Sequence, residues 1–250
     1  MRSANAQAAA GLAEGGGIRG RDCVRDRSGE AGTPQGSPIS PLLANVALHV
    51  LDQAWQASGQ RLGVLVKDAD DLVALCATRE QTEEARELVA AVLDAFGLRL
   101  HPDKTRIAHL ARGAEGFDFL GFHHRMRKSW KWRGRWYLQK WPSKRAMASI
   151  KGKIRDQTAR RLARLPLEDT VESVNHAVRG WGNYFRYGNS GQKFSQIDSY
   201  VHERLAILAS TKHGLTGRNW VTRFNDEWCT RIGVYRLSGT VRPTTAYARR

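Results

Sequence analysis

The sequence predicts an α+β protein whose first half mixes helices with strands and whose second half is helical. Two apolar, β-prone runs flank a short acidic turn within residues 64–75, a pattern typical of a β-hairpin. Three later segments repeat apolar residues at helical spacing, which predicts a small three-helix bundle. Between the halves, residues 121–165 hold fifteen Lys and Arg residues and one acidic residue, Asp156. This basic block indicates a polyanionic partner.

Local signals define the elements of the first half. Residues 1–31 lack a convincing period and contain a glycine run, so we expect an irregular N-terminal segment. Residues 42–55 carry apolar side chains at helical spacing after two prolines, and residues 78–96 start with a capping box. Each of these two segments predicts a helix. The short apolar runs at residues 98–100 and 117–122 predict strands.

The second half begins with a basic segment, residues 128–138, that has a glycine at the expected turn of a hairpin. Apolar residues then line three amphipathic helices within residues 147–165, 171–185 and 197–208. The short connections between these helices are typical of a bundle. Residues 215–250 are basic and less regular.

The overall charge favours nucleic acid as the partner. The chain carries 40 Lys and Arg against 24 Asp and Glu residues, a formal net charge of +16. Cations that neutralise phosphates release counterions, which gives strongly salt-dependent binding. A basic run can also be a solvated surface or a membrane-surface helix. Aromatic residues among the cations favour nucleic acid, because unpaired bases stack on such rings. These aromatic residues are Trp130, Trp132, Trp136, Tyr137 and Trp141.

The three cysteines give no sign of a disulfide framework or a zinc site. Cys23, Cys76 and Cys229 are far apart and odd in number. This usage fits a reducing, cytoplasmic location. No stretch approaches the roughly 20 apolar residues that a spanning helix needs, and residues 1–20 lack the apolar core of a signal peptide. We therefore expect no membrane partner and no targeting segment.

The acidic turn, residues 68–71, is a candidate metal site. Neighbouring carboxylates repel one another on a rigid hairpin unless a cation lies among them. Hard oxygen ligands suit Mg²⁺, which keeps several waters and takes further ligands from substrate phosphates. Acidic residues at a hairpin turn are also common solvated turn formers. Both interpretations stay open from this segment alone.

Further motifs surround the acidic turn in a fixed order. Pro34-Gln35-Gly36 precedes it, and His101-Pro102-Asp103-Lys104 and Phe117-Asp118-Phe119-Leu120-Gly121 follow it. Arg179-Gly180-Trp181-Gly182-Asn183-Tyr184-Phe185-Arg186 lies farther on. In this order the chain resembles the reverse transcriptase/maturases encoded by group II introns, and the acidic turn is similar to their Tyr-Ala-Asp-Asp box. The resemblance covers residues 32–214, most of the chain.

The resemblance implies the parts of the chain and their roles. It divides the chain into an irregular segment 1–31, a partial reverse-transcriptase palm 32–127, a basic hairpin with a helical thumb or maturase domain 128–214, and a basic tail 215–250. Asp70 and Asp71 would be the catalytic Mg²⁺ ligands. Gln35, Gly36 and Lys104 would lie near the nucleotide and template, and Leu120 and Gly121 would grip the primer. The candidate RNA-binding residues are Arg133, Arg135, Trp136, Lys140, Lys144, Arg145, Lys151 and Arg155.

Two departures from the family pattern bear on activity. The family's other metal-binding aspartate and its fingers have no counterpart before Pro34, and Asp68 replaces the tyrosine of the box. The implied parent activity is RNA-directed DNA polymerisation from dNTPs on an RNA/DNA primer-template, together with binding of intron RNA for splicing. We expect this chain alone to be inactive as a polymerase. Three alternatives stay open: a non-catalytic RNA-binding maturase module, a degenerate product of a truncated mobile element, or an enzyme completed by a dimer or a split-palm partner.

Overall fold

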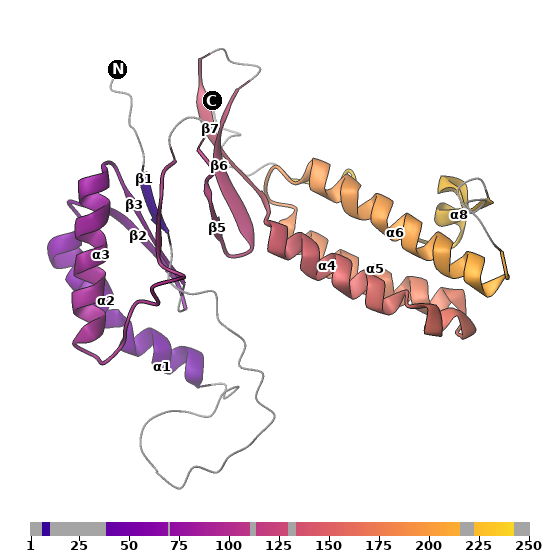
Figure 1. Cartoon of the computed structure of the whole chain (residues 1–250), viewed down its shortest axis with the longest axis horizontal. Coiled ribbons are helices and arrows are strands. Elements are labelled where there is room, and N and C mark those ends of the chain that lie inside the picture. The colour runs from indigo at the N-terminus through magenta and orange to yellow at the C-terminus, as the bar shows by residue number, and fades with distance from the viewer. Residues whose placement is uncertain are drawn as a thin grey trace, which may run out of the picture. The chain divides into compact units, whose positions relative to one another are not determined.

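The structure is a computed structural model that describes residues 7–10, 39–69, 71–110, 114–129, 134–215 and 223–242. The chain forms two compact units (Figure 1). The mixed unit comprises residues 1–120 and 125–137, and the helical unit comprises residues 121–124 and 138–250. Strands and helices occur together in the first and helices dominate the second, so the predicted α+β class is confirmed.

A four-stranded sheet forms the centre of the mixed unit. Its strand order is β2-β3-β1-β4, and β1 pairs antiparallel with both of its neighbours. The strands are β1 (Gln7–Ala10), β2 (Gly63–Asp68), β3 (Asp71–Cys76) and β4 (Arg106–Ala108). The sequence predicted no strand in residues 1–31, because a short Gln-Ala-Ala-Ala run has no apolar alternation. β1 depends instead on pairing with segments more than sixty residues away in the chain.

The helical elements of this unit are α1 (Ser40–Ala47), α2 (His49–Ala54), the π-helical turn η1 (Trp55–Gly59) and α3 (Arg79–Asp94). α2, η1 and α3 pack on one face of the sheet, whereas the apolar residues Leu42, Leu43 and Val46 of α1 are exposed. The helix expected at residues 42–55 is therefore divided at Leu48 and prolonged by η1. The core between helices and sheet contains Leu51, Trp55, Leu72, Ala85 and Val89.

The capping box of α3 is confirmed. The Thr78 hydroxyl accepts a hydrogen bond from the Gln81 amide, and the Gln81 side chain accepts one from the Thr78 amide, each 3.2 Å long. This reciprocal pair satisfies amides that have no partner within the helix. The strand expected at residues 98–100 is wrong, because these residues have no ladder partner and Leu100 instead packs on the core. The strand in this part of the chain is β4.

A three-stranded sheet of order β5-β6-β7 follows, formed by β5 (Phe117–Phe119), β6 (Phe122–Lys128) and β7 (Trp136–Pro142). β6 and β7 are neighbours in this sheet and flank the basic hairpin expected at residues 128–138, of which residues 130–133 lie outside the described residues. Gly134, in the connection between β6 and β7, has a φ of +80°, a conformation that glycine adopts without strain.

Within its described residues, the helical unit contains the three predicted helices and two further helical turns. They are α4 (Lys144–Gln157), the 3₁₀ turn η2 (Arg160–Arg164), α5 (Leu167–Phe185), α6 (Gly191–Lys212) and α8 (Asp226–Arg231). The predicted three-helix bundle is confirmed, since α4, α5 and α6 pack pairwise around one core. The largest fully buried side chains of this core include Phe194, Ile150, Ile154, Ile197 and Leu205. No helix in the described ranges is both long and apolar enough to cross a membrane.

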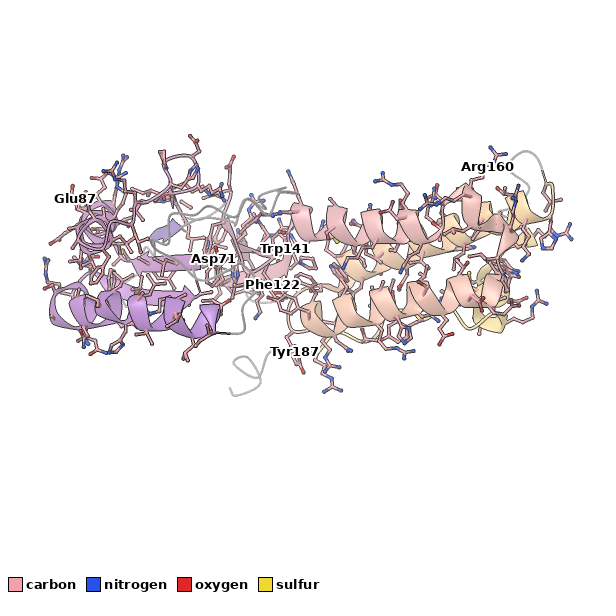
Figure 2. All side chains as sticks on the ribbon, turned by 90° about the horizontal axis from the view of Figure 1, so that it is seen from below. Asp71, Glu87, Phe122, Trp141, Arg160 and Tyr187 are labelled. Atoms are coloured by element: carbon pink, nitrogen blue, oxygen red, sulfur yellow. The ribbon has the colours of Figure 1, made fainter. Side chains whose placement is uncertain are left out.

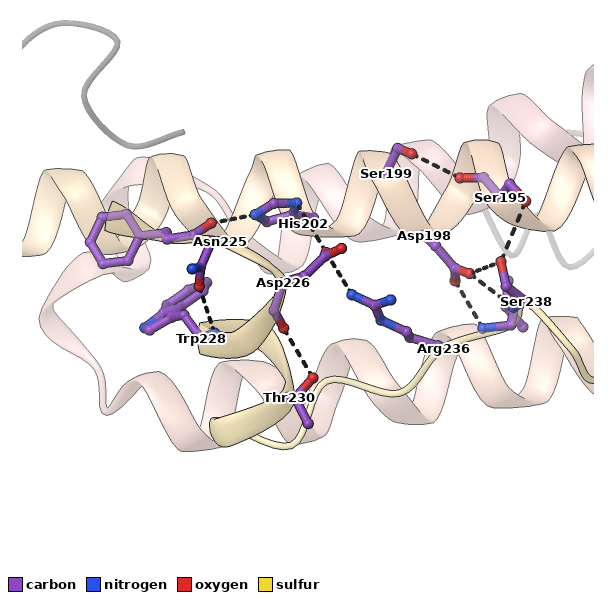
Figure 3. Close-up of polar contacts among 12 residues, drawn as sticks. Ser195, Asp198, Ser199, His202, Asn225, Asp226, Trp228, Thr230, Arg236 and Ser238 are labelled. Atoms are coloured by element: carbon purple, nitrogen blue, oxygen red, sulfur yellow. Dashed lines mark hydrogen bonds and ion pairs between the residues drawn. The ribbon is translucent and has the colours of Figure 1, made fainter. Parts of the chain in front are cut away.

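Residues 233–242, which we call the C-terminal strap, lie against α5 and α6. Asn175 accepts a hydrogen bond from the Tyr235 amide (2.7 Å), and Asp198 accepts bonds from the amides of Leu237 and Ser238 (2.8 Å each). Figure 3 shows the bonds from the strap to Asp198. Leu237 is fully buried. The strap is thus part of the folded helical unit, although its sequence has no helical or strand period.

Leu237 fits because the facing position on α5 is a glycine. A Cβ atom added at Gly182 would lie only 2.2 Å from the Leu237 Cδ2 atom. Any larger residue at position 182 would therefore have to displace the leucine. The glycine in the last turn of α5 permits this close approach.

Candidate nucleic-acid interface

The acidic turn joins β2 to β3. Asp68 ends β2, Asp71 begins β3, and the two residues are direct cross-strand partners. Ala69, in the two-residue loop between them, has a φ of +52°, which is typical of the tight turns that connect hairpin strands. The predicted hairpin is confirmed. Asp70 lies outside the described residues.

The pleat places both carboxylates on the sheet face opposite α3. Asp68 and Asp71 alternate with Lys67 and Leu72, and Leu72 belongs to the core beneath the helices. The Lys67 ammonium lies 2.6 Å from the Asp52 carboxylate and donates a hydrogen bond to the Leu48 carbonyl (3.1 Å). The lysine nearest the acidic turn is therefore held against α2, on the helix side of the sheet.

The neighbouring strand adds no carboxylate to this site. β1 pairs with β3 and consists of one glutamine and three alanines. Among the described residues, no three His, Cys, Asp or Glu side chains converge as a metal site. Asp68 and Asp71 offer hard oxygen ligands on the two sides of the turn, a donor chemistry that suits part of a Mg²⁺ shell.

Removing the charge of Asp68 is expected to stabilise the mixed unit. Like charges directly opposite in an antiparallel pair are destabilising, so Asp68→Tyr and the near-isosteric Asp68→Asn should each raise the free energy of unfolding by up to about 1 kcal/mol at pH 7. Urea unfolding at pH 7 measures this. If both variants are less stable at pH 7, Asp68 has a stabilising role that repulsion does not describe.

Three of the residues predicted to contact nucleotide, template or primer fall in tight turns of the described chain. Lys104 is in the turn after α3, where its amide donates to the His101 carbonyl (3.2 Å). Leu120 and Gly121 form the two-residue turn between β5 and β6, with φ values of +49° and +74°. Two consecutive positive φ angles are typical of a type I′ hairpin turn. Gln35 and Gly36 lie outside the described residues.

Gly121 is restricted by contacts as well as by its backbone. A Cβ atom at this position would lie 3.2 Å from the Phe185 ring. Its carbonyl accepts a hydrogen bond from the Ser143 amide (2.8 Å), directly before α4. The residue that was predicted to grip a primer is thus hydrogen-bonded to the residue that precedes α4.

The candidate RNA-binding residues of the hairpin lie along β7 and just before it. The Arg135 carbonyl accepts a hydrogen bond from the Ser129 amide (2.8 Å), and the partly exposed Trp136 begins β7. The Lys140 ammonium lies 5.1 Å from the centroid of the Phe122 ring. Arg133 lies outside the described residues.

Helix α4 presents its cations on its outer side. At 3.6 residues per turn, Lys144, Lys151 and Arg155 lie within about 20° of one direction around the axis. We call these three residues the α4 stripe. Lys144 and Arg155 are exposed, whereas the partly buried Lys151 lies 5.3 Å from the centroid of the Tyr200 ring. Arg145 is exposed beside the stripe.

A polar groove borders the stripe where α4 meets α6. It encloses about 450 Å³ and is lined by Lys151, Tyr200, Glu203, the amide side chains of Gln192 and Gln196, and two serines. A cation, an aromatic ring and two amides can contact a phosphate, a base face and base edges, respectively. The sequence identified Lys151 and missed the other lining residues, because they come from a helix forty residues farther along.

The two cysteines in the described ranges are not candidate nucleophiles. Burial raises the pKa of the Cys76 thiol, although a hydrogen bond with Thr82 acts in the opposite direction. Burial also raises the pKa of Cys229. Both are free and buried, so they are expected to be protonated and inert near neutral pH.

Comparison with known families agrees with this arrangement. Residues 17–124 match the family described as reverse transcriptase (RNA-dependent DNA polymerase), and residues 147–225 match the group II intron, maturase-specific domain. The first match contains the acidic hairpin, and the second contains α5, α6 and most of α4. A reverse-transcriptase domain joined to a maturase domain defines the class of protein. The chain therefore combines a match to a reverse-transcriptase domain with a match to a group II intron maturase-specific domain, in agreement with its resemblance to group II intron reverse transcriptase/maturases.

Two curated proteins are similar to parts of the chain. Protein YkfC of Escherichia coli (strain K12) is 34% identical over 134 residues, which are 41% of this chain and 34% of YkfC. The Retron Mx162 reverse transcriptase of Myxococcus xanthus is 35% identical over 91 residues, which are 32% of this chain and 19% of that protein. The chain thus spans about a third of the first relative and about a fifth of the second.

Proposed function

We propose that the chain binds structured intron RNA through its helical unit. The observation that carries this proposal is the α4 stripe, which lies largely within the region matched by the maturase-specific domain. RNA duplexes are recognised mostly by shape and by contacts to phosphates and 2′-hydroxyls. A row of cations on a rigid helix provides phosphate contacts, and the polar groove beside it provides groups for unpaired bases. The free, buried thiols of Cys76 and Cys229 fit a reducing cytoplasmic location.

Filter binding of a structured group II intron RNA tests this proposal. At about 50 mM salt we expect a dissociation constant of about 1 µM or tighter, since phosphate contacts dominate affinity under these conditions. No retention of the RNA at about 100 µM protein would contradict RNA binding.

We further infer that the acidic turn supplies part of a Mg²⁺ site and that this chain alone does not polymerise DNA. Bound Mg²⁺ pairs stabilise the attacking and leaving oxygens of phosphoryl transfer. Asp70 and Asp71 would hold the ion, with water and substrate phosphates completing its shell. Two features oppose a productive site: β1, next to β3, contains no acidic residue, and Asp68 adds a charge directly opposite Asp71.

The isolated chain is therefore expected to give no primer extension on a poly(rA)/oligo(dT) template with Mg²⁺ and dTTP. Incorporation of labelled dTTP measures this outcome, with an active reverse transcriptase as the positive control. Robust incorporation that is lost in Asp70→Ala and in Asp71→Ala would contradict the inference. It would also show that these two carboxylates are catalytic.

A further inference from the structure

Two exposed tyrosines lie at the end of α5, beside cations. Tyr184 is 53% exposed and Tyr187 is 42% exposed. Arg186, between them, keeps helical backbone angles, and its guanidinium lies 5.0 Å from the centroid of the Tyr187 ring. Figure 2 shows Tyr187 projecting away from the helices. Tyrosine rings are usually more buried, so two such rings close together in the sequence indicate a contact surface.

The Tyr184 ring is held from one side by other aromatic rings. Its centroid lies 5.5 Å from that of Phe122 and 4.8 Å from that of Phe185. Phe122 and Phe185 are buried in the core of the helical unit. The Lys140 ammonium, 5.1 Å from the Phe122 ring, brings a second cation to this aromatic cluster.

The backbone around Tyr187 is also fixed. The Asn189 amide donates a hydrogen bond to the Lys140 carbonyl (2.7 Å), and a Cβ atom at Gly188 would lie 2.7 Å from that same oxygen. On the other side, the Arg186 carbonyl accepts a hydrogen bond from the Arg242 amide of the C-terminal strap (2.8 Å). The backbone around Tyr187 is therefore ordered before RNA binds, which lowers the entropy cost of binding.

The charge around these rings indicates which kind of partner they bind. No acidic residue lies between Glu172 and Asp198 in the sequence, so the end of α5 and the following loop carry only basic or neutral side chains. Exposed rings combined with cations match a single-stranded nucleic acid, in which bases stack on the rings and phosphates meet the cations. A base inside a duplex is already stacked on its neighbours and cannot use such a ring.

We propose that Tyr184, Arg186, Tyr187 and Lys140 form a platform that binds an unpaired segment of the RNA. One base stacks on Tyr187 and an adjacent base on Tyr184, while the flanking phosphates contact Arg186 and Lys140. The proposal rests on the proposed RNA binding and adds a specific subsite for unpaired nucleotides.

The test compares two RNAs, a blunt hairpin and the same hairpin with a single-stranded 3′ extension that contains 5-iodouridine. Wild-type protein should bind the extended RNA more tightly. Ultraviolet irradiation should crosslink the extension to Tyr187 or Tyr184, as mapped by mass spectrometry, whereas 5-iodouridine placed within the stem should not crosslink there. Tyr187→Ala should weaken binding of the extended RNA by about tenfold and leave the blunt hairpin unaffected. Tyr187→Phe, which keeps the ring, should bind like wild type.

The other outcomes distinguish failure of the platform from failure of RNA binding. If wild type binds both RNAs equally and the crosslinks map elsewhere, the platform is wrong while RNA binding stands. The platform is also wrong if Tyr187→Ala weakens the binding of both RNAs equally, or of neither RNA. The exposed rings would then contact another partner, such as a protein. If wild type binds neither RNA, both the platform and the proposed function fail. The crosslinks use wild-type protein, so they stay decisive even if a variant is unstable.

Discussion

Replacing Lys144, Lys151 and Arg155 together with Glu should weaken binding of structured RNA by about two orders of magnitude or more at about 50 mM salt. At each position that contacts a phosphate, the substitution removes the counterion release that favours binding and adds a negative charge that repels the RNA. Lys144 and Arg155 are exposed and Lys151 is partly buried beside Tyr200, while the apolar face formed by Met147, Ile150 and Ile154 is unchanged. The variant should therefore keep the core of the helical unit. Filter binding, with circular dichroism to check the fold, measures the loss.

A charge-matched control separates the α4 stripe from the overall charge. Replacing Arg86, Arg99 and Arg106 with Glu changes the net charge by the same amount, but these exposed residues belong to the mixed unit. This control should lose far less affinity than the stripe variant. An equal loss in the two variants would mean that net charge alone attracts RNA, and it would contradict a binding site on α4.

Replacing Leu237 with Ala should destabilise the helical unit by about 2–5 kcal/mol, the usual cost of truncating a fully buried leucine. The side chain packs where Gly182 leaves space on α5, so its truncation leaves a cavity beside this helix. Urea unfolding followed by far-ultraviolet circular dichroism measures the effect. Leu165→Ala is the matched control, because Leu165 is about half exposed and its truncation should change stability far less than that of Leu237, by about 0.5 kcal/mol.

Equal stability of these two variants would show that the C-terminal strap is not part of the cooperative unit. The expected difference bears on function as well, because the strap holds the Arg186 carbonyl through Arg242. Loosening the strap should therefore also disturb the tyrosine platform at the end of α5.

Elements with strong local signals could be predicted from the sequence. The acidic hairpin, the capping box at Thr78 and the three helices of the bundle each depend on residues close together in the chain. β1 could not be predicted, because four small or polar residues become a strand only when they pair with β3 and β4. The apolar run at residues 98–100 gave the opposite error, since a run of three cannot distinguish a strand from a loop that packs on the core.

The candidate site, too, could be predicted from the sequence only in part. The α4 stripe follows from helical spacing, so Lys144, Lys151 and Arg155 could be placed on one face before the structure was known. The exposure of Tyr184 could not, because its neighbour Phe185 is buried and only the packing of α5 decides which ring faces outward. The burial of Leu237 likewise depends on a glycine more than fifty residues away.

The salt dependence of RNA binding tests most directly whether the α4 stripe contacts RNA phosphates. Binding constants for one structured RNA are measured from about 50 to 200 mM KCl, and the logarithm of the association constant is plotted against the logarithm of the salt concentration. Wild type should give a slope of about −3 or steeper, and the stripe variant a slope shallower by about 3, one for each lost phosphate contact. A wild-type slope near zero, or the same slope in both proteins, would contradict RNA binding through the α4 stripe.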